Sequence, residues 1–454
     1  MPQFIGRREL PRYLTLPCAG GGVLLALLGA ARMLGLAQGS LGARVVVMVL
    51  LLAMAAAAGV LLARRGDGLG PLLLLPVGLA FFLRALCLDH MSLDYQDFLA
   101  QWVGFFRQNG GFAAIRLPVG NYNVPYLYFL AAISYLDIPD LYLIKLFSIA
   151  FDVVLAWGGC RLVALFRDRE SPLPALAGCL LLLLPTVVAN GSYWGQCDAL
   201  YGALILHAMA DAMDRRPGRS VVLLAVAFSF KLQAIFLLPL WCAFWFARRV
   251  KFWHLLLFPA TYFITILPAL LLGKPLWDTL GVYLGQMGVN SALSFNAPSV
   301  YQLIPYGTVL DETLAARIGI VAAFVLVLGV LGALFPFRRR LDNAALLTAG
   351  VVMAVGVPFL LPYMHDRYFF LADALTLVWA CAGLGSAAWA VLVQLSSLSA
   401  YFTYFRMKFT FPLRLGHGVL AMGLEALMML AVLVWMGSAL AGRLAALPRP
   451  ARTE

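Results

Sequence analysis

Long apolar segments recur along almost the whole chain, and shorter polar stretches separate them. A helix needs about 20 apolar residues to cross the hydrocarbon core of a bilayer, and many of these segments approach or exceed that length. The backbone inside lipid must satisfy its own hydrogen bonds, so helices are expected throughout. The candidate membrane spans are residues 14–34, 43–63, 70–88, 122–137, 141–166, 173–190, 199–213, 220–247, 255–272, 313–335, 343–361, 370–393 and 416–441.

Strict alternation between the two faces of the membrane fails at three consecutive segments, 122–137, 141–166 and 173–190. The polar loops before and after them are expected on the same face, and an odd number of crossings cannot connect them. Lys145 and Asp152 interrupt the middle segment, so we predict a broken or re-entrant element there. Broken helices are tolerated in membranes where they line a cavity.

Segment 220–247 disturbs the alternation a second time, because it joins two basic clusters that both belong in the cytoplasm. Lys231 and Gln233 interrupt this segment, and we predict a second broken or re-entrant element here. With both breaks, the pattern predicts an all-α polytopic membrane protein with roughly 11–14 transmembrane helices. The polar loops are too short to hold a separate soluble domain.

Composition agrees with this class. Hydrophobic residues make up 63% of the 454 residues and charged residues only 12%, whereas a soluble domain averages about 45–50% apolar and about 25% charged residues. The net charge of +12 would suit nucleic-acid binding in a soluble protein. In a membrane protein it instead indicates the excess of Lys and Arg that cytoplasmic loops carry.

Basic clusters and polar, acid-containing stretches alternate in the gaps between apolar segments. We place the clusters in the cytoplasm and the polar stretches outside. The clusters are Arg7, Arg8 and Arg12; Arg64 and Arg65; Arg167 and Arg169; Arg215, Arg216 and Arg219; Arg248, Arg249 and Lys251; Arg338, Arg339 and Arg340; and Arg406, Lys408 and Arg414. The outer stretches are 89–123, 190–198, 273–312 and 361–368. The first apolar run lacks a clear cleavage site, so we predict an uncleaved helix with a cytoplasmic N-terminus in a plasma or inner membrane.

The stretch 395–414 mixes aromatic and basic residues, a pattern typical of an interfacial helix, here on the cytoplasmic face. This assignment places the C-terminal tail, with Arg443, Arg449 and Arg452, outside, against the charge rule. The expected regions are an N-terminal two-helix extension (1–69), a transmembrane catalytic core (70–394), and an interfacial helix with the last transmembrane helix (395–454).

The seven cysteines lie in or beside apolar runs, without a C-x-x-C pair. We expect them to be small buried hydrophobic residues, except Cys197, which lies in an outer turn. Their spacing predicts no metal site.

Three acids, Asp89, Asp94 and Asp97, follow the segment 70–88 directly. They are either solvated loop charges or the start of a site. The sequence "DYQDFLAQWVGFF" has apolar residues at helical spacing, which predicts an amphipathic helix at the outer interface with Asp94 at its start. A carboxylate held at the bilayer surface is well placed as a base for a sugar hydroxyl.

The turn "NGSYWGQCDALYG" lies between two apolar segments and contains Trp194, Gln196 and Asp198. A turn requires Gly195 but neither the amide nor the acid. A Gln offers a donor and an acceptor for vicinal hydroxyls, and a Trp gives a flat wall and a ring N–H. The structural alternative is that Trp194 anchors the interface and Asp198 caps the next helix.

Further polar groups stand where the apolar pattern does not require them. Lys231 lies inside an apolar stretch and is either half of an ion pair, with Asp152 as one candidate partner, or a cation that meets an anion in a cavity. His365 and Arg367 stand together at the outer end of a span and suit a phosphate. Arg367 could instead snorkel to the interface with Asp366 as its partner. An outer cavity lined by these groups and the acids suits a lipid-phosphate substrate.

Several motifs together resemble the polytopic GT-C glycosyltransferases, and most closely the bacterial relatives of the second mannosyltransferase of GPI-anchor assembly. The motifs are "LDYQDFLAQW", "GNYNVPYLYFL", "NGSYWGQCDALY", "FKLQAIFLLP", "NAPSVYQLIP" and "HDRYFF", in the family's order over about residues 70–375. The chain departs from the family in Gln101, where a Pro often precedes the Trp, and in two spans before the family's first helix.

The resemblance implies a role for each matching residue. Asp94 would be the catalytic base, and His365 and Arg367 would bind the phosphate of the donor. Trp194, Gln196 and Asp198 would shape the pocket of the sugar or acceptor. The other residues expected to bind substrate are Tyr95, Tyr122, Asn123, Lys231, Gln233 and Asn296.

The implied function is transfer of a hexose, possibly mannose in this family, from a polyprenyl-phosphate carrier to a lipid- or glycan-linked hydroxyl on the outer face, with inversion. No cofactor or metal is expected, although Asp94 and Asp198 could share a divalent ion. The partners implied are the lipid-linked donor, the acceptor and the bilayer, and no nucleic acid. The alternative is a transporter or flippase of lipid-linked oligosaccharides, which would need polar groups through the whole membrane depth. A membrane scaffold would leave the outer acids unexplained.

Overall fold

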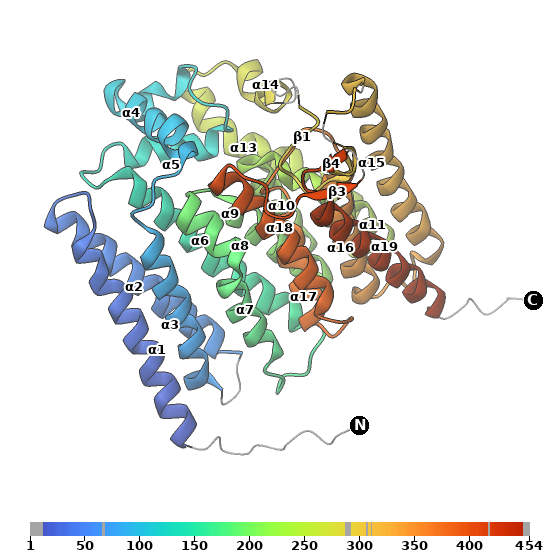
Figure 1. The fold of residues 1–454 in the computed structure, drawn as a ribbon, viewed down its shortest axis with the longest axis horizontal. Coiled ribbons are helices and arrows are strands. Elements are labelled where there is room, and N and C mark those ends of the chain that lie inside the picture. Colours follow the sequence, from blue (N-terminus) through green and yellow to red (C-terminus); the bar gives the residue numbers. More distant parts are fainter. Residues whose placement is uncertain are drawn as a thin grey trace, which may run out of the picture. The chain divides into compact units, whose positions relative to one another are not determined.

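A computed structural model describes residues 12–65, 69–286, 292–305, 307–309, 311–415 and 418–447. The chain divides into two compact units (Figure 1). Unit 1 comprises Met1–Gln101 and Leu136–Ala199, and unit 2 comprises Trp102–Tyr135 and Leu200–Glu454. The predicted division into residues 1–69, 70–394 and 395–454 stays a prediction.

Unit 1 is a helical bundle in which α1 packs along α3, and α2 and α6 pack beside them (Figure 1). Gly22 of α1 and Gly78 of α3 allow the close approach, since a Cβ at either position would overlap the backbone of the other helix. Small residues are the usual means of bringing membrane helices together. The helical segments are α1 (Arg12–Arg32), η1 (Met33–Gly35), α2 (Leu41–Ala63), α3 (Gly70–Cys87), η2 (Tyr95–Leu99), α6 (Asp140–Val163), α7 (Leu173–Leu183), α8 (Pro185–Val188) and η4 (Ala189–Trp194).

Unit 2 holds the remaining helices and two small strand pairs; α4 (Ala100–Gln108) and α9 (Asp198–Met213) begin at its border with unit 1. Its other helical segments are η3 (Gly111–Arg116), α5 (Val124–Ile133), α10 (Pro217–Phe230), η5 (Leu232–Phe236), α11 (Leu240–Phe246), α12 (Phe252–Leu255), α13 (Leu257–Leu271), α14 (Leu276–Gln286), η6 (Val300–Leu303), α15 (Glu312–Leu334), η7 (Phe335–Phe337), α16 (Asn343–Leu360), α17 (Phe370–Cys381), α18 (Ala388–Arg406) and α19 (Gly423–Ala446). The strand β1 (Ser294–Phe295) pairs in parallel with β2 (Met364–His365), and β3 (Leu413–Leu415) pairs antiparallel with β4 (Gly418–Leu420).

Eight helices in the described part of the chain are long and apolar enough to cross a membrane. A ninth span is possible by length if α7 and the segment Pro185–Trp194 count together, with a bend of 48° between them. The predicted all-α polytopic fold with a broken element is therefore confirmed. The number of membrane helices reaches the predicted range of roughly 11–14 only if the three shorter apolar helices α5, α10 and α17 are counted as partial spans. The long spans are Leu14–Gly35, Leu41–Ala63, Gly70–Cys87, Asp140–Val163, Phe252–Leu271, Glu312–Phe337, Asn343–Leu360 and Gly423–Ala446.

The first problem of alternation has a different solution from the predicted one. The helix α6 runs without a break through Lys145 and Asp152, so the prediction of a broken element there is wrong. The break lies at Leu184, between α7 and α8. The preceding α5 has ten residues, about 15 Å of helix, which is half of the hydrocarbon core. With α5 too short to cross, α6 and the bent α7–α8 segment give an even number of crossings if the bent segment counts as one span.

The predicted second break, at Lys231, is confirmed. Lys231 has extended backbone angles between α10 and η5. The chain then returns toward its starting point, because Trp241 Nε1 donates to Ser220 Oγ at 3.0 Å. Burial lowers the pKa of Arg249, and the positive charge of the nearby Arg215 lowers it further. The segment from α10 to α11 therefore begins and ends at the same end of unit 2.

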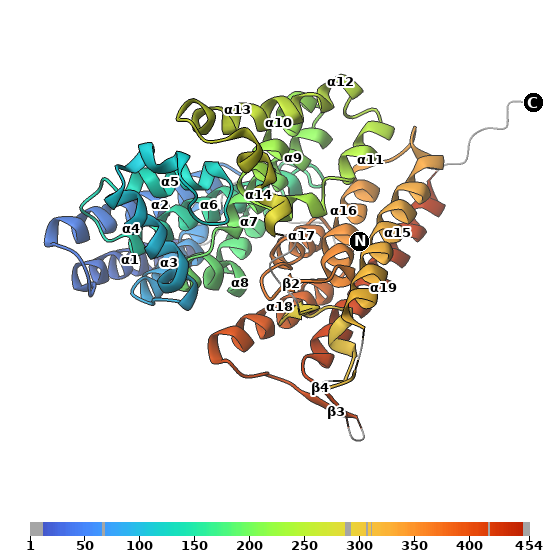
Figure 2. The same cartoon turned by 90° about the horizontal axis from the view of Figure 1, so that it is seen from above.

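The two ends of unit 2 differ in character. The basic end holds Arg215 and Arg249, together with Asp342, whose charge also acts on Arg249. The other end, where the strands β3 and β4 lie next to α19 (Figure 2), is called the pocket end. It holds a cavity lined by residues from the start of α15, the loop after α18 and the segment before α19. Tyr301 ties the end of α16 to this end, because its hydroxyl donates to the carbonyl of Leu360 at 3.2 Å.

The structure also changes the picture of residues 395–414. They do not form a separate interfacial helix; residues 388–406 form one helix, α18, in which Ser397 donates to Asp373 and Ser399 to Glu425. Phe409 then reaches the pocket end. The helix α19 leads back from the pocket end, and near its C-terminus Arg443 donates to the carbonyl of Leu384, in the turn between α17 and α18. Arg449 and Arg452 lie outside the described residues.

Candidate functional site

The carboxylate of Asp94 accepts two hydrogen bonds from the turn after α8, within unit 1. Trp194 Nε1 donates to Asp94 Oδ2 at 3.0 Å, and Gln196 Nε2 donates to the same oxygen at 2.5 Å. Asp94 immediately precedes η2 and is partly exposed, whereas Trp194 and Gln196 are buried. We name these three residues the Asp94 clamp. The sequence pattern predicted each member for the site, and the structure brings the three together.

Local backbone geometry places the two donors of the clamp. The π-helical η4 ends at Trp194, and Gly195 adopts a left-handed conformation, with φ of 84°. Glycine adopts this conformation without the steric cost that a Cβ would add. The hydroxyl of Ser92 donates to the carbonyl of Trp194 at 2.6 Å, and Ser148 donates to that of Gln196 at 2.7 Å. The turn is therefore fixed from both sides.

Lys145 fixes the segment that leads to Asp94. Its buried ammonium donates to the carbonyls of Cys87, Leu88 and His90 at 2.8, 3.1 and 2.6 Å. The last carbonyls of a helix have no partner within the helix, so a cation at the end of α3 satisfies them. The sequence analysis missed this role, although a lysine inside an apolar segment must find buried acceptors.

Asp198 and Tyr95 form hydrogen bonds with residues other than Asp94. Asn190 Nδ2 donates to Asp198 Oδ2 at 2.7 Å, and the backbone N–H of Asp198 donates to Asn190 Oδ1 at 3.2 Å. The reciprocal pair closes the turn before α9. Both predicted roles of Asp198, in the pocket or as a helix cap, stay predictions. Tyr95 donates to Asp140 Oδ2 at 3.2 Å.

A second interaction beside the clamp is the stack of His90 on Tyr193, with ring centroids 3.6 Å apart and an angle of 9° between the planes. Burial lowers the pKa of His90, and the positive charge of Lys145 lowers it further. The imidazole is therefore neutral at pH 7. A neutral ring stacks without adding charge next to a buried ammonium.

Asp152 pairs with Arg84, a residue that the sequence analysis did not select. Arg84 Nη2 lies 2.9 Å from Asp152 Oδ2, and both side chains are fully buried. Arg84 also donates to the carbonyl of Leu182 at 2.8 Å, just before the break between α7 and α8. The proposed pairing of Asp152 with Lys231 is therefore wrong. An arginine and an aspartate in neighbouring apolar segments were the available signal, since such charges require partners.

In unit 2, Lys231 lies over the ring of Tyr122, with its Nζ 6.0 Å from the ring centroid. Asn123 donates to the carbonyl of Ser229 at 2.9 Å and accepts from the N–H of Val124. It therefore caps α5 and ties it to the end of α10. Gln233 is buried in η5. The structure brings Tyr122, Asn123 and the break at Lys231 into one neighbourhood.

His365 and Asn296 meet through the backbone, as an isolated bridge beside the β1–β2 pair. The ring of His365 stacks on Phe295 with centroids 4.8 Å apart and contacts Tyr368. Arg367 lies 3.9 Å from Asp366, at the limit of an ion pair, as expected for the interfacial alternative.

The predicted site residues thus form three groups: the Asp94 clamp in unit 1, the group at Lys231 and the group at His365 in unit 2. Their roles and their convergence on one cavity stay predictions. Within the described ranges, no three His, Cys, Asp or Glu side chains are grouped as a metal site would require.

Comparison with models of protein families finds no match, and a search of curated proteins finds no relative either. The resemblance to the GT-C glycosyltransferases therefore rests on the sequence motifs alone.

Proposed function

We propose that the protein is a GT-C-type membrane glycosyltransferase that transfers a hexose, with mannose as the first candidate, from a polyprenyl-phosphate carrier to a lipid- or glycan-linked acceptor. The observation that carries the proposal is the Asp94 clamp. It holds a carboxylate at the end of a membrane segment in one orientation. Orientation of this kind is what a general base requires.

In the proposed reaction, the acceptor hydroxyl attacks the anomeric carbon of the donor sugar. The bond from that carbon to the phosphate oxygen breaks, and the polyprenyl phosphate leaves with the electron pair. Asp94 takes the proton of the hydroxyl. A single displacement inverts the anomeric configuration.

His365, Arg367 and Lys231 are proposed to stabilise the negative charge that develops on the leaving phosphate. Arg367 is only partly exposed, with 16% of its side chain accessible, and Lys231 is buried. Cations with little water around them act on an anion more strongly than exposed ones. No metal ion is required by this scheme.

The proposed orientation follows from the distribution of basic residues. Arg215 and Arg249 share the basic end of unit 2, which we place in the cytoplasm by the positive-inside rule. The pocket end is then outside. Because α19 leads from the pocket end toward Arg443 and the turn at Leu384, we place the C-terminal end of α19, with Arg443, in the cytoplasm, contrary to the expectation from sequence and in agreement with the charge rule.

A transporter of lipid-linked oligosaccharides remains the rival function. The buried charges Arg84, Asp152 and Lys145 of unit 1 are paired with one another or with carbonyls. A transport path would instead expose such groups to a passing headgroup. These contacts favour the transferase.

The direct test is an assay of the purified protein in nanodiscs with radiolabelled polyprenyl-phosphate sugars and lipid acceptors extracted from membranes. Transfer of label that Asp94→Asn abolishes, without a change in folding, would support the proposal. Movement of a fluorescent lipid-linked oligosaccharide across a sealed vesicle, without any transfer, would establish the rival function.

A further inference from the structure

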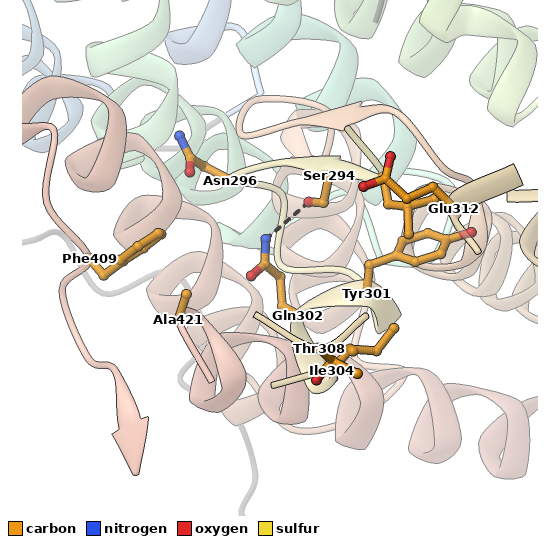
Figure 3. A pocket seen from close by; sticks show the side chains of 10 residues that line it. Ser294, Asn296, Tyr301, Gln302, Ile304, Thr308, Glu312, Phe409 and Ala421 are labelled. Carbon is orange, nitrogen blue, oxygen red and sulfur yellow. Dashed lines mark hydrogen bonds between the residues drawn. The ribbon is translucent and has the colours of Figure 1, made fainter. Parts of the chain in front are cut away.

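A cavity of about 260 Å³ opens at the pocket end of unit 2 (Figure 3). Its polar lining comes from β1, η6 and the start of α15, and Phe409 faces it from the loop after α18. The volume lies just below the range of about 300–1,000 Å³ that is typical of drug-sized ligands. The cavity therefore matches one small ring rather than a long chain. The residues that the argument uses are Ser294, Asn296, Tyr301, Gln302, Glu312 and Phe409.

We propose that this cavity binds one neutral sugar ring of a substrate. The described lining contains two amides, three hydroxyl groups from Ser294, Tyr301 and Thr308, one carboxylate and the aromatic rings of Tyr301 and Phe409, but neither Lys nor Arg. Amides provide both donors and acceptors for vicinal hydroxyls, and an aromatic ring covers the apolar face of a sugar. A carboxylate without a lining cation disfavours a phosphate or another anion.

Neighbouring contacts hold the polar groups of the cavity in place. Gln302 Nε2 donates to Ser294 Oγ at 3.1 Å (Figure 3), and Ser294 donates to the carbonyl of Ala297. Tyr301 donates to the carbonyls of Ala315 and Leu360 at 3.4 and 3.2 Å, which connects η6 to α15 and α16. Burial, with a smaller contribution from the nearby Tyr363, raises the pKa of Tyr301 to about 12. The phenol is therefore neutral and remains a donor at physiological pH.

The position of Asn296 connects the cavity to the proposed phosphate-binding residues. Asn296 lines the cavity, has a left-handed φ of 56°, and forms a backbone bridge to His365. Asparagine is one of the few residues other than glycine that adopt this conformation readily. A sugar in the cavity would thus lie next to a phosphate held by His365. The assignment of the sugar to a transfer substrate rests on the proposed function, whereas the binding of a sugar does not.

Binding is tested first, without any assay of transfer. The full-length protein in nanodiscs is mixed with methyl mannoside, methyl glucoside, inorganic phosphate or choline, and saturation-transfer NMR measures contact with each. We expect signals from a sugar, and about a ten-fold loss of affinity in Gln302→Ala, the cost of one lost neutral hydrogen bond or more. Phe409→Leu serves as a second variant, and Asn109→Ala, an exposed amide in the turn after α4, is the control.

The outcomes separate the two proposals. Sugar binding that is equal in wild type, Gln302→Ala and Phe409→Leu would overturn the site, and so would binding of phosphate or choline that Gln302→Ala weakens. If transfer is observed, a rise in KM for the acceptor in Gln302→Ala assigns the ring to the acceptor, and a rise in KM for the donor assigns it to the donor. Sugar binding that depends on Gln302 in a protein without any transferase activity would retain the site and refute the enzyme.

Discussion

Removing either N–H donor from Asp94 is expected to slow transfer far more than it destabilises the fold. Gln196→Met removes the amide that lies 2.5 Å from Asp94 Oδ2 and keeps a side chain of similar length. Trp194→Phe removes the ring N–H at 3.0 Å and keeps an aromatic ring in the buried site. In both variants the carboxylate keeps one of these two donors and loses part of its fixed orientation.

The magnitude follows from the type of hydrogen bond. A hydrogen bond to a charged group contributes about 1.5–3 kcal/mol, and each 1.36 kcal/mol corresponds to a ten-fold change in rate. Each single variant should therefore lose roughly 10- to 100-fold in kcat if orientation of the base limits the reaction. Because both donors bind the same oxygen, the two effects should not add. The double variant should show a coupling free energy of about 0.5–3 kcal/mol.

The assay measures transfer of a radiolabelled sugar per folded molecule, with the folded fraction taken from thermal melting of the same sample. Gln101→Ala is the matched control, because Gln101 is an exposed glutamine on the helix α4 that follows η2. Activity within two-fold of wild type in both clamp variants would refute the reasoning. So would strictly additive losses, which would indicate that the two donors do not act through one carboxylate.

Three further predictions concern stability. Lys145→Met should lower the free energy of unfolding by about 2 kcal/mol or more, because three carbonyls lose a charged donor. Removal of the buried ammonium offsets only part of this loss. Denaturation of both proteins in the same detergent measures the difference. Gly22→Ala should lower the melting temperature, because its Cβ would overlap the carbonyl of Leu74, whereas Gly20→Ala on the same helix meets open space and should not lower it. The pKa of His90 in the folded state lies below its unfolded value of about 6.5. The unfolded state therefore binds more protons as the pH falls through 6.5, and the stability of the fold decreases. Between pH 7 and pH 5, the melting temperature of His90→Phe should fall less than that of the wild type.

The sequence predicted the break at Lys231 correctly but misplaced the break between the first and second outer loops. A charged residue interrupts an apolar helix only if neighbouring segments offer it no partner. Lys145 finds three carbonyls and Asp152 finds Arg84, so α6 continues through both. The break occurs before Pro185 instead, where the ring disfavours a helical residue at Leu184. Proline was the better local signal, while the partners of the charges lie far away in the sequence.

The stretch 395–414 illustrates a limit of hydropathy patterns. Its mixture of aromatic and basic residues is typical of a helix exposed to an interface. In the structure, Ser397 and Ser399 face the acids Asp373 and Glu425 on the neighbouring helices. A polar face that meets buried acids and a polar face that meets water have the same sequence pattern. Only the packing of α17, α18 and α19 distinguishes the two.

The backbone around the clamp gives a separate reason to regard it as functional. Asp94 directly precedes the π-helical η2, and Trp194 ends the π-helical η4. Helices of this type account for well under 1% of residues in ordinary proteins and occur frequently at functional sites. A regular α-helix over Ala189–Trp194 would point the side chains of Trp194 and Gln196 in another direction. Two such segments that meet at one carboxylate are therefore better explained by the orientation of Asp94 than by the stability of unit 1.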